Sequence, residues 1–331
     1  MEIVFTELVA VTDASSVGEV RRTALKSARR LGFDETRTGE FALVATEASR
    51  NVLLHGGGGE VILTGSMEPG TAPVARILAI DRGAGIPDVP LAISDCYSTA
   101  GTMGVGLGAM KRIATTLEIF TGKSGTIVLL EFGSPAKKEQ VQFAGLTVPY
   151  PGESSCGDGW HCHQMPGRTL ALLADGLGHG FGAAEAAREA IATFQQRTQS
   201  GPAQILGYIH DALRKTRGAV AAVAEIRPKD QVLVYAGIGN IAGVVMDSRG
   251  RRSLVSHSGT LGVTVSKIQE FQSEWSSNSI LVLHSDGLHS KWDLSPYAGL
   301  WNRHPALIGG VLLRDFRRQR DDAGVVVLKA A

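Results

Sequence analysis

The sequence has few cysteines and no long apolar run. Its 331 residues include only Cys96, Cys156 and Cys162, too few for a disulfide framework in a chain of this size. Apolar stretches such as 219–223 and 325–328 fall far short of the roughly 20 residues that span a bilayer. The N-terminus carries acidic residues but lacks the basic region of a signal peptide. We therefore expect reduced thiols, a cytoplasmic location and no membrane partner.

The chain also has little net charge. Its 33 basic and 32 acidic residues give a formal charge of +1, so it lacks the broad basic surface that nucleic-acid binding requires. Hydrophobic residues make up 44% and charged residues 20% of the sequence, as in ordinary globular proteins. At about 150 residues per domain, the length predicts two domains. Whether the chain forms a homo-oligomer stays open.

The N-terminal part predicts an α/β sandwich. Helical spacing predicts helices over 16–31 and 35–54, the second ended by four glycines at 56–59. Strands are expected over 60–65 and 74–81, and a hairpin over 117–132. Between them a glycine-rich segment runs into a helix that ends near Thr116. The mixed Pro, Gly, Ser and charged stretch 133–140 predicts the domain boundary, giving domains 1–134 and 141–331.

The C-terminal part predicts a strand-rich α+β domain. Three helices are expected, over 181–199, 202–216 and 305–320. Around them lie short strand-like runs bounded by Gly, Asp or Pro, at 141–152, 160–164, 168–175, 221–226, 231–239, 242–247, 279–287 and 323–330. The whole chain is therefore predicted to be α+β, with two domains.

Glu47 and Asn51 stand four residues apart on the second predicted helix, so both project from one face. A carboxylate there can deprotonate an attacking hydroxyl, and an amide oxygen can complete the shell of a Mg²⁺ ion that holds phosphates. Taken alone, these two residues favour an ordinary exposed helical pair. Asp81, at a strand end, and the glycines before the next helix add the means to bind adenine and phosphates.

The ordered set TEASRNVLLHGGGG, DRGAGI, GTMGVGLGAMKRIA and SGTIVLLEF resembles the GHKL ATPase superfamily, which has the Bergerat fold, over residues 5–132. Within it, the set is most similar to anti-sigma-factor type kinases of the RsbT-like kind. Such proteins phosphorylate Ser or Thr on small STAS-domain proteins or bind regulatory partners, and both options stay open here. The resemblance implies ATP with Mg²⁺ and these roles: Glu47 as catalytic base, Asn51 as Mg²⁺ ligand, Asp81 as adenine anchor, Gly83 and Gly85 as its turn, Gly104, Gly106 and Gly108 as phosphate loop, and Thr126 as a further nucleotide contact.

Four aspartates occupy predicted strand or turn ends in the second half: Asp158, Asp175, Asp286 and Asp321. Mg²⁺ and Mn²⁺ prefer such hard oxygen ligands, and a pair of these ions can activate water and neutralise a phosphoryl group. Asp and Gly are also common turn residues, so any one Asp-Gly pair alone favours a turn.

The series GDGW, LLADGLGHGFGAAEAA, VYAGIGNIAG, SHSGTLGV, LVLHSDGL and DDAGVVVL resembles SpoIIE-type phosphatases of the protein phosphatase 2C (PPM) family, in particular the RsbX-like kind, over residues 141–331. Such a domain is a β-sandwich flanked by helices, with two Mn²⁺ or Mg²⁺ ions. The chain departs from the usual final motif at Gly324, where threonine is common. The resemblance implies catalytic metal ligands at Asp158, Asp175, the Gly176 carbonyl, Asp286 and Asp321, with Asp322 as a lesser candidate.

Three further motifs leave alternatives open. His179 could serve as general acid for the leaving serine oxygen, or hold its turn in place. Asn240 and His257 are expected to shape the site. The cysteines and histidines at 156–163 do not have the usual zinc-knuckle spacing, so a strand or loop is favoured over zinc there.

These features predict a metal-dependent phosphoserine/phosphothreonine phosphatase joined to an ATP-binding switch-kinase domain, acting on STAS-domain or stressosome-type regulators. In the alternative, the first half only senses nucleotide or binds a partner.

Overall fold

The computed structural model describes residues 2–67, 70–94, 106–133 and 140–331. It divides into two compact units. The N-terminal unit comprises Met1–Lys137 and Tyr297–Gly310, and the C-terminal unit comprises Lys138–Pro296 and Val311–Ala331. The predicted two-domain α+β class is confirmed, and most of the expected boundary 133–140 lies outside the described residues.

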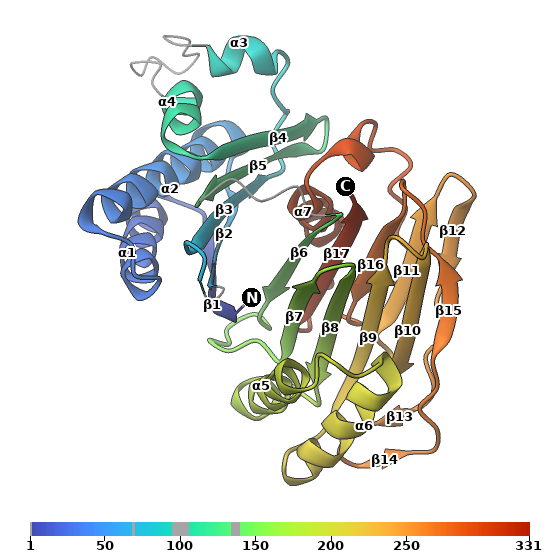
Figure 1. Cartoon of the computed structure of the whole chain (residues 1–331). Helices are drawn as coiled ribbons and strands as arrows, with labels where there is room; N and C mark the ends of the chain where they lie inside the picture. The colour runs from blue at the N-terminus through green and yellow to red at the C-terminus, as the bar shows by residue number, and fades with distance from the viewer. Residues whose placement is uncertain (1, 68–69, 95–105, 134–139) are drawn as a thin grey trace. The chain divides into compact units, whose positions relative to one another are not determined.

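The N-terminal unit is built on a five-stranded antiparallel sheet in the order β1-β2-β3-β5-β4. Helices α1 and α2 pack together, and both contact this sheet (Figure 1). The expected helices and hairpin are present, but β1 was not among the expected elements. The bounds are β1 Glu2–Val11, α1 Ala14–Arg30, α2 Glu35–Gly56, β2 Gly59–Met67, β3 Val74–Asp81, α3 Val89–Ile93, α4 Gly106–Ile113, β4 Thr116–Gly122 and β5 Gly125–Phe132.

Local sequence fixes the two long helices. Asp13 accepts hydrogen bonds from the backbone of the first turn of α1, and Asp34 does the same for α2, so both helices start at an aspartate cap. Gly57, in the left-handed region at φ 68°, ends α2. Phe41 of α2 packs edge-on against Phe132 of β5, with ring centroids 5.1 Å apart, in the core between helices and sheet.

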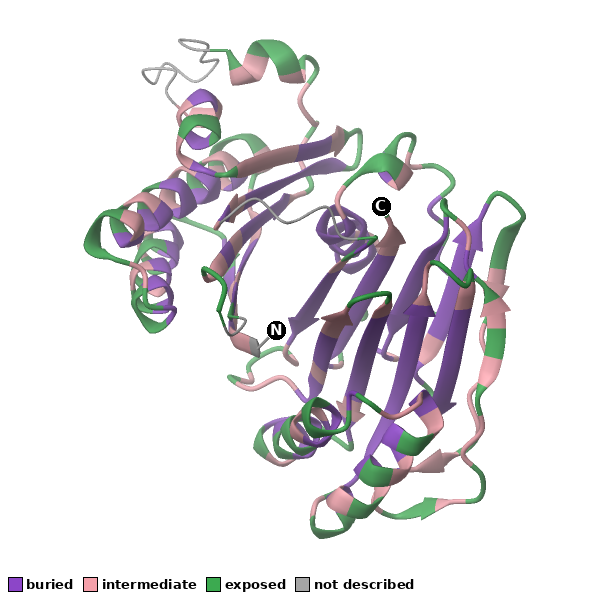
Figure 2. Ribbon diagram, viewed as in Figure 1, coloured by how far each residue is buried: buried purple, intermediate pink, exposed green. Residues whose placement is uncertain are grey.

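The C-terminal unit is a sandwich of two antiparallel sheets, ordered β15-β10-β9-β8-β7 and β12-β11-β16-β17-β6. Helices α5 and α6 cover the first sheet, and the strand interiors are buried (Figure 2). The bounds in this unit are β6 Val141–Val148, β7 Asp158–Met165, β8 Arg168–Gly176, α5 Phe181–Gln196, α6 Pro202–Ala212, η1 Leu213–Lys215, β9 Ala219–Arg227, β10 Val232–Ile238, β11 Ala242–Asp247, β12 Gly250–Ser253, β13 Gly259–Thr260, β14 Thr264–Val265, β15 Phe271–Glu274, β16 Ile280–His284 and β17 Ala323–Ala330. Two later elements, η2 Leu300–Asn302 and the first half of α7 Pro305–Phe316, group with the N-terminal unit.

Strand pairing brings the ends of these strands together. Asp158, at the start of β7, is directly opposite Asp175, near the end of β8. In the second sheet, His284 at the end of β16 is opposite Val325 of β17. Asp286 therefore follows β16 and Asp321 precedes β17 at the same end of these two strands.

No helix in the described part of the chain is long and apolar enough to cross a membrane.

Two of the four Cys and His residues considered for zinc, His161 and Cys162, are buried in β7. Cys162 is fully buried, and the His161 ring packs against Phe194 of α5 with centroids 5.6 Å apart. Burial lowers the pKa of His161 to about 3. Neutral His161 is therefore a packing residue in β7.

Acid should destabilise the fold through His161. Because its folded pKa lies below the unfolded value, its stabilising contribution is present above pH 6.5 and is lost as the pH falls toward 3. Urea unfolding measures this effect. Between pH 6.5 and 4 the free energy of unfolding should fall by roughly 1–3 kcal/mol less in His161→Gln than in wild type. The exposed His289→Gln is the control; equal pH slopes in all three proteins would contradict this assignment.

Candidate active site and nucleotide pocket

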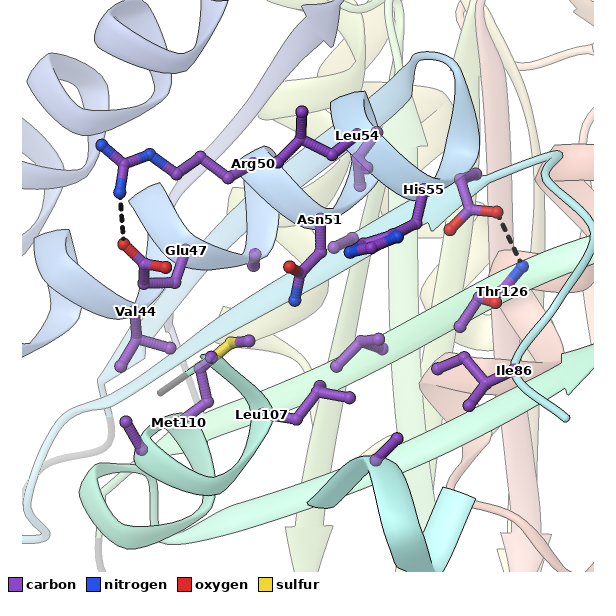
Figure 3. Close-up of a pocket in the computed structure, with 18 of the residues that line it drawn as sticks. Val44, Glu47, Arg50, Asn51, Leu54, His55, Ile86, Leu107, Met110 and Thr126 are labelled. Atoms are coloured by element: carbon purple, nitrogen blue, oxygen red, sulfur yellow. Dashed lines mark hydrogen bonds and ion pairs between the residues drawn. The ribbon is translucent and has the colours of Figure 1, made fainter. Parts of the chain in front are cut away.

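A cavity of about 520 Å³ opens in the N-terminal unit beside α2, β3 and α4 (Figure 3). This volume lies in the range of small-molecule sites. Six of the predicted nucleotide residues line it: Glu47, Asn51, Asp81, Gly85, Gly106 and Thr126. Gly108 instead faces the buried side of α4, and Gly104 lies outside the described residues.

Asp81 is held as an acceptor at the end of β3. Its Oδ1 accepts hydrogen bonds from the Gly83 N–H at 2.8 Å and the Thr126 N–H at 3.0 Å. No bond to Oδ2 is formed within the described ranges, and the residue lines the cavity. A carboxylate with one oxygen fixed and the other available suits recognition of an exocyclic amine.

Gly83 and Gly85 permit the chain to turn close behind Asp81. A Cβ at Gly83 would lie 2.5 Å from the His55 carbonyl oxygen. Gly85 has a φ of 84°, and a Cβ there would lie 2.5 Å from the Gly122 carbonyl oxygen. Both positions therefore require glycine.

Glu47 and Asn51 project from α2 into the same cavity (Figure 3). The Glu47 carboxylate accepts a hydrogen bond from the Arg50 guanidinium at 2.9 Å, a contact not expected from the sequence. The Asn51 amide lies close to the start of α4, since a Cβ on Gly106 would be 3.8 Å from its Nδ2. The side-chain oxygen of Asn51, 3.9 Å from the same point, therefore lies beside the first residue of α4.

In the C-terminal unit, a second cavity of about 610 Å³ is lined by three of the predicted aspartates, Asp175, Asp286 and Asp321. Asp286 Oδ2 accepts a hydrogen bond from the Asn240 side chain at 2.8 Å, which ties the turn after β10 to the turn after β16. Asp158 does not line this cavity and is only 4% exposed, but it pairs with Asp175 across the two strands.

Ser285 fixes the Asp158 carboxylate, a role that the sequence did not reveal. The Gly324 N–H donates to Ser285 Oγ at 2.9 Å, and the Ser285 hydroxyl donates to Asp158 Oδ2 at 2.6 Å. A Cβ at Gly324 would lie 3.0 Å from Asp158 Oδ2. Glycine at the position where threonine is common therefore leaves room for this carboxylate, and Ser285 supplies the hydroxyl.

Asp322 is the more buried member of the final aspartate pair. Its Oδ1 accepts the Tyr150 N–H at 2.8 Å, which anchors the loop after β6, and the residue is 3% exposed. Asp321 is more accessible and borders the cavity. The two aspartates therefore differ in role: Asp322 holds the chain, and Asp321 faces the hollow.

The carboxylates repel one another. Burial, followed by the charges of Asp286, Asp321 and Asp322, raises the pKa of Asp175 well above its usual range. Burial and the charge of Asp175 raise the pKa of Asp158 in the same direction. Such a cluster is relieved by cations.

The donor set suits a hard divalent ion, although its side chains are not already gathered. Asp158 Oδ1 and Asp322 Oδ2 are buried without a hydrogen-bond partner. Among residues the structure describes, no group of three or more His, Cys, Asp or Glu side chains stands ready to hold a metal ion. Carboxylate and carbonyl oxygens are the ligands that Mg²⁺ and Mn²⁺ prefer, so the residues fit these ions chemically once they are drawn together.

His179 borders the same cavity from the loop between β8 and α5. Its Nδ1 lies 3.0 Å from Glu153 Oε1, and its ring stacks on Tyr150 with centroids 4.7 Å apart. His257, in contrast, packs its ring against Phe271 with centroids 5.6 Å apart, which is a shaping role.

Comparison with known proteins assigns a family to each part of the chain. Residues 165–330 match the family model described as stage II sporulation protein E (SpoIIE), and residues 10–132 match the histidine kinase-like ATPase domain. Asp158 lies just outside the first match. The chain is similar to the serine/threonine-protein kinase RsbT of Bacillus subtilis, with 31% identity over 93 residues, covering 28% of this chain and 69% of RsbT.

It is also similar to the phosphoserine phosphatase RsbX of the same organism, with 23% identity over 154 residues, covering 46% of this chain and 77% of RsbX. A crystal structure of RsbX in complex with magnesium superimposes with a TM-score of 0.53 at 19% identity over 65% of this chain and 100% of that chain. A structure described under the bacterial stressosome superimposes with a TM-score of 0.55 at 26% identity, over 58% of this chain and 100% of that chain. The chain therefore belongs to the SpoIIE family of PPM-type serine/threonine phosphatases, and it carries an N-terminal histidine kinase-like ATPase domain.

Proposed function

We propose that the C-terminal unit removes phosphate from serine or threonine of a STAS-domain regulator, using two Mn²⁺ or Mg²⁺ ions. The observation that carries this proposal is that three strand-end aspartates line one cavity in the C-terminal unit and that Asp158 lies opposite one of them, Asp175. The ligands would be Asp158, Asp175, the Gly176 carbonyl, Asp286 and Asp321. When bound, the ions would supply an activated water and neutralise the phosphoryl group.

The chain's own residues prepare this chemistry. Ser285 orients Asp158, and Asn240 orients Asp286. The buried setting of Asp158 strengthens its attraction for a cation, because water screens it poorly. These hydrogen bonds keep the carboxylates positioned before the substrate binds.

Hydrolysis of a phosphoserine peptide tests the proposal. The purified chain should release phosphate when Mn²⁺ is supplied and stop when a chelator is added, with activity returning on renewed Mn²⁺. Equal release with and without the metal, or none under either condition, would refute it.

His179 is proposed as the general acid that protonates the leaving serine oxygen. Glu153 holds its Nδ1, which leaves Nε2 for the substrate. His179→Gln should slow hydrolysis of phosphoserine roughly 10²-fold. It should slow p-nitrophenyl phosphate much less, because p-nitrophenolate leaves without protonation. Equal losses on both substrates would indicate a structural role instead.

For the N-terminal unit we propose binding of ATP with Mg²⁺, with Asp81 and Thr126 at the adenine end and Asn51 as the Mg²⁺ ligand. Glu47 is proposed as the base that activates a partner's serine or threonine. The similarity to RsbT favours transfer to a STAS-domain protein. A second candidate, nucleotide sensing without transfer, is favoured by the ion pair that engages Glu47 with Arg50.

The two activities would set and reset one phosphorylation state. STAS-domain regulators are proposed as partners because the chain resembles both RsbT and RsbX and a structure described under the bacterial stressosome. ATP consumption in the presence of a STAS-domain protein separates the candidates: binding without phosphoryl transfer would leave only the sensing function.

A further inference from the structure

A third hollow of about 850 Å³ adjoins the carboxylate cavity of the C-terminal unit, and both are lined by Gly178 and His179. It lies between the loop that joins β8 to α5 and the turn that precedes β9. We call it the flanking groove, lined by Glu153, 178–182, Glu185 and 215–217. Apart from His179 and its partner Glu153, the lining residues have no part in the proposed chemistry.

Arg217 lines the flanking groove, and its side chain packs against two glycines. A Cβ at Gly182 would lie 2.6 Å from Arg217 Nε, and one at Gly178 would lie 3.5 Å from its Nη1. A side chain at Gly182 would displace the guanidinium, whereas Gly178 contacts it at ordinary van der Waals distance. Across the described ranges, Arg217 has no ion pair or hydrogen bond and stays exposed, so its donors are available to a ligand.

The turn that carries Arg217 is held firmly. Thr216 Oγ1 donates to the Leu213 carbonyl at 2.8 Å and accepts the Gly218 N–H at 3.0 Å. The Leu177 N–H donates to the Gly218 carbonyl at 3.0 Å, which ties this turn to the loop after β8. The basic side chains at 215 and 217 therefore start from an ordered backbone.

The lining of the flanking groove combines exposed positive charges with an exposed aromatic ring. Lys215 and Arg217 are both exposed cations, whereas the carboxylate of Glu153 is engaged by His179. Glu185 is the remaining acid of the lining. Phe181, which is 70% exposed, supplies an aromatic ring to the same lining, and the Arg188 guanidinium lies over that ring at 5.3 Å from its centroid. An exposed aromatic ring beside free cations is typical of a surface that receives another chain.

We infer that the flanking groove binds the polypeptide on one side of the phosphorylated residue and selects acidic side chains there through Lys215 and Arg217, with an apolar side chain on Phe181. The inference rests on the proposed phosphatase function, because the groove adjoins the cavity where the phosphate would bind. It makes the sequence around the phosphoserine, and not the phosphate alone, a determinant of the substrate.

Peptide pairs test this. Two phosphoserine peptides are compared, identical except that the residues flanking the phosphoserine are Asp/Glu in one and Lys in the other. The wild-type chain with Mn²⁺ should show about a tenfold higher kcat/KM for the acidic peptide, as expected for a few partly exposed charge pairs. The ratio is taken within each protein, so that a general loss of activity cancels.

Arg217→Glu and Lys215→Glu should each lower this ratio several-fold, and the double variant should invert it. Arg214→Glu is the matched control, since Arg214 is an exposed neighbour that pairs with Asp211 outside the groove, and its ratio should equal that of wild type. If both variants hydrolyse the peptides and keep the wild-type ratio of kcat/KM, the inferred role of the flanking groove is refuted, but the proposed phosphatase function is not. Absence of hydrolysis of either peptide by wild type with Mn²⁺ overturns the proposed phosphatase and the groove with it.

Discussion

Asp175→Asn should lower Mn²⁺-dependent hydrolysis of a phosphoserine peptide by about 10³-fold, which corresponds to roughly 4 kcal/mol of lost transition-state stabilisation. Asparagine keeps the shape of the side chain but removes the charge that faces the cavity, at a position directly opposite Asp158 across β7 and β8. Initial rates at saturating Mn²⁺ give the measurement.

Asp175→Asn should increase stability although it lowers activity. Because burial and neighbouring acids disfavour the ionised form of Asp175, asparagine should raise the melting temperature of the metal-free protein. Asp211→Asn, an exposed change in α6, is the control and should alter neither quantity. Activity of Asp175→Asn within threefold of wild type would contradict the proposed role of Asp175.

Glu47→Gln should reduce the rate of phosphoryl transfer from ATP to a STAS-domain partner by about 10²–10³-fold, while the Kd for ATP changes less than threefold. Glutamine cannot accept the proton of the attacking hydroxyl, but it retains the volume of Glu47 and leaves Asp81 and its two N–H donors untouched. Transfer is followed with labelled ATP, and binding by calorimetry.

Glu40→Gln is the matched control on the same helix, since Glu40 forms a comparable i,i+3 ion pair with Arg37 away from the cavity. It should transfer phosphate at the wild-type rate. If wild type transfers phosphate and Glu47→Gln transfers it equally fast, Glu47 is not the base.

Elements fixed by local signals were predictable. Asp34 starts α2 and glycines end it, so the expected span 35–54 lies within the observed Glu35–Gly56. β3 was expected at its observed bounds because apolar residues stop at Asp81. Asp81 itself followed from that strand end together with the glycines of its turn.

Elements fixed by distant contacts were not predictable. The β1 sequence is rich in Val, Ile, Phe and Thr, which are frequent in strands, but its place in the sheet is set by pairing with β2, about 50 residues away. Residues 297–310 group with the N-terminal unit although they lie far along the chain. The helix expected over 305–320 ends at Phe316, where Arg317 pairs with Leu288 instead.

The candidate phosphatase site divides in the same way. Four aspartates were identifiable from motifs, since each lies beside a glycine or a second aspartate at a strand end. Ser285 was not, because its hydrogen bond to Asp158 joins residues 127 positions apart. The pairing of His179 with Glu153 joins two loops and likewise has no sequence signal.

The most direct test of the central claim is the mass of a phosphorylated STAS-domain protein after incubation with this chain and Mn²⁺, without ATP. We predict that the partner loses the mass of its phosphoryl group, and that Asp175→Asn leaves it phosphorylated. A partner that keeps its phosphate with the wild-type chain, while a general phosphatase removes it in a parallel sample, would contradict the account.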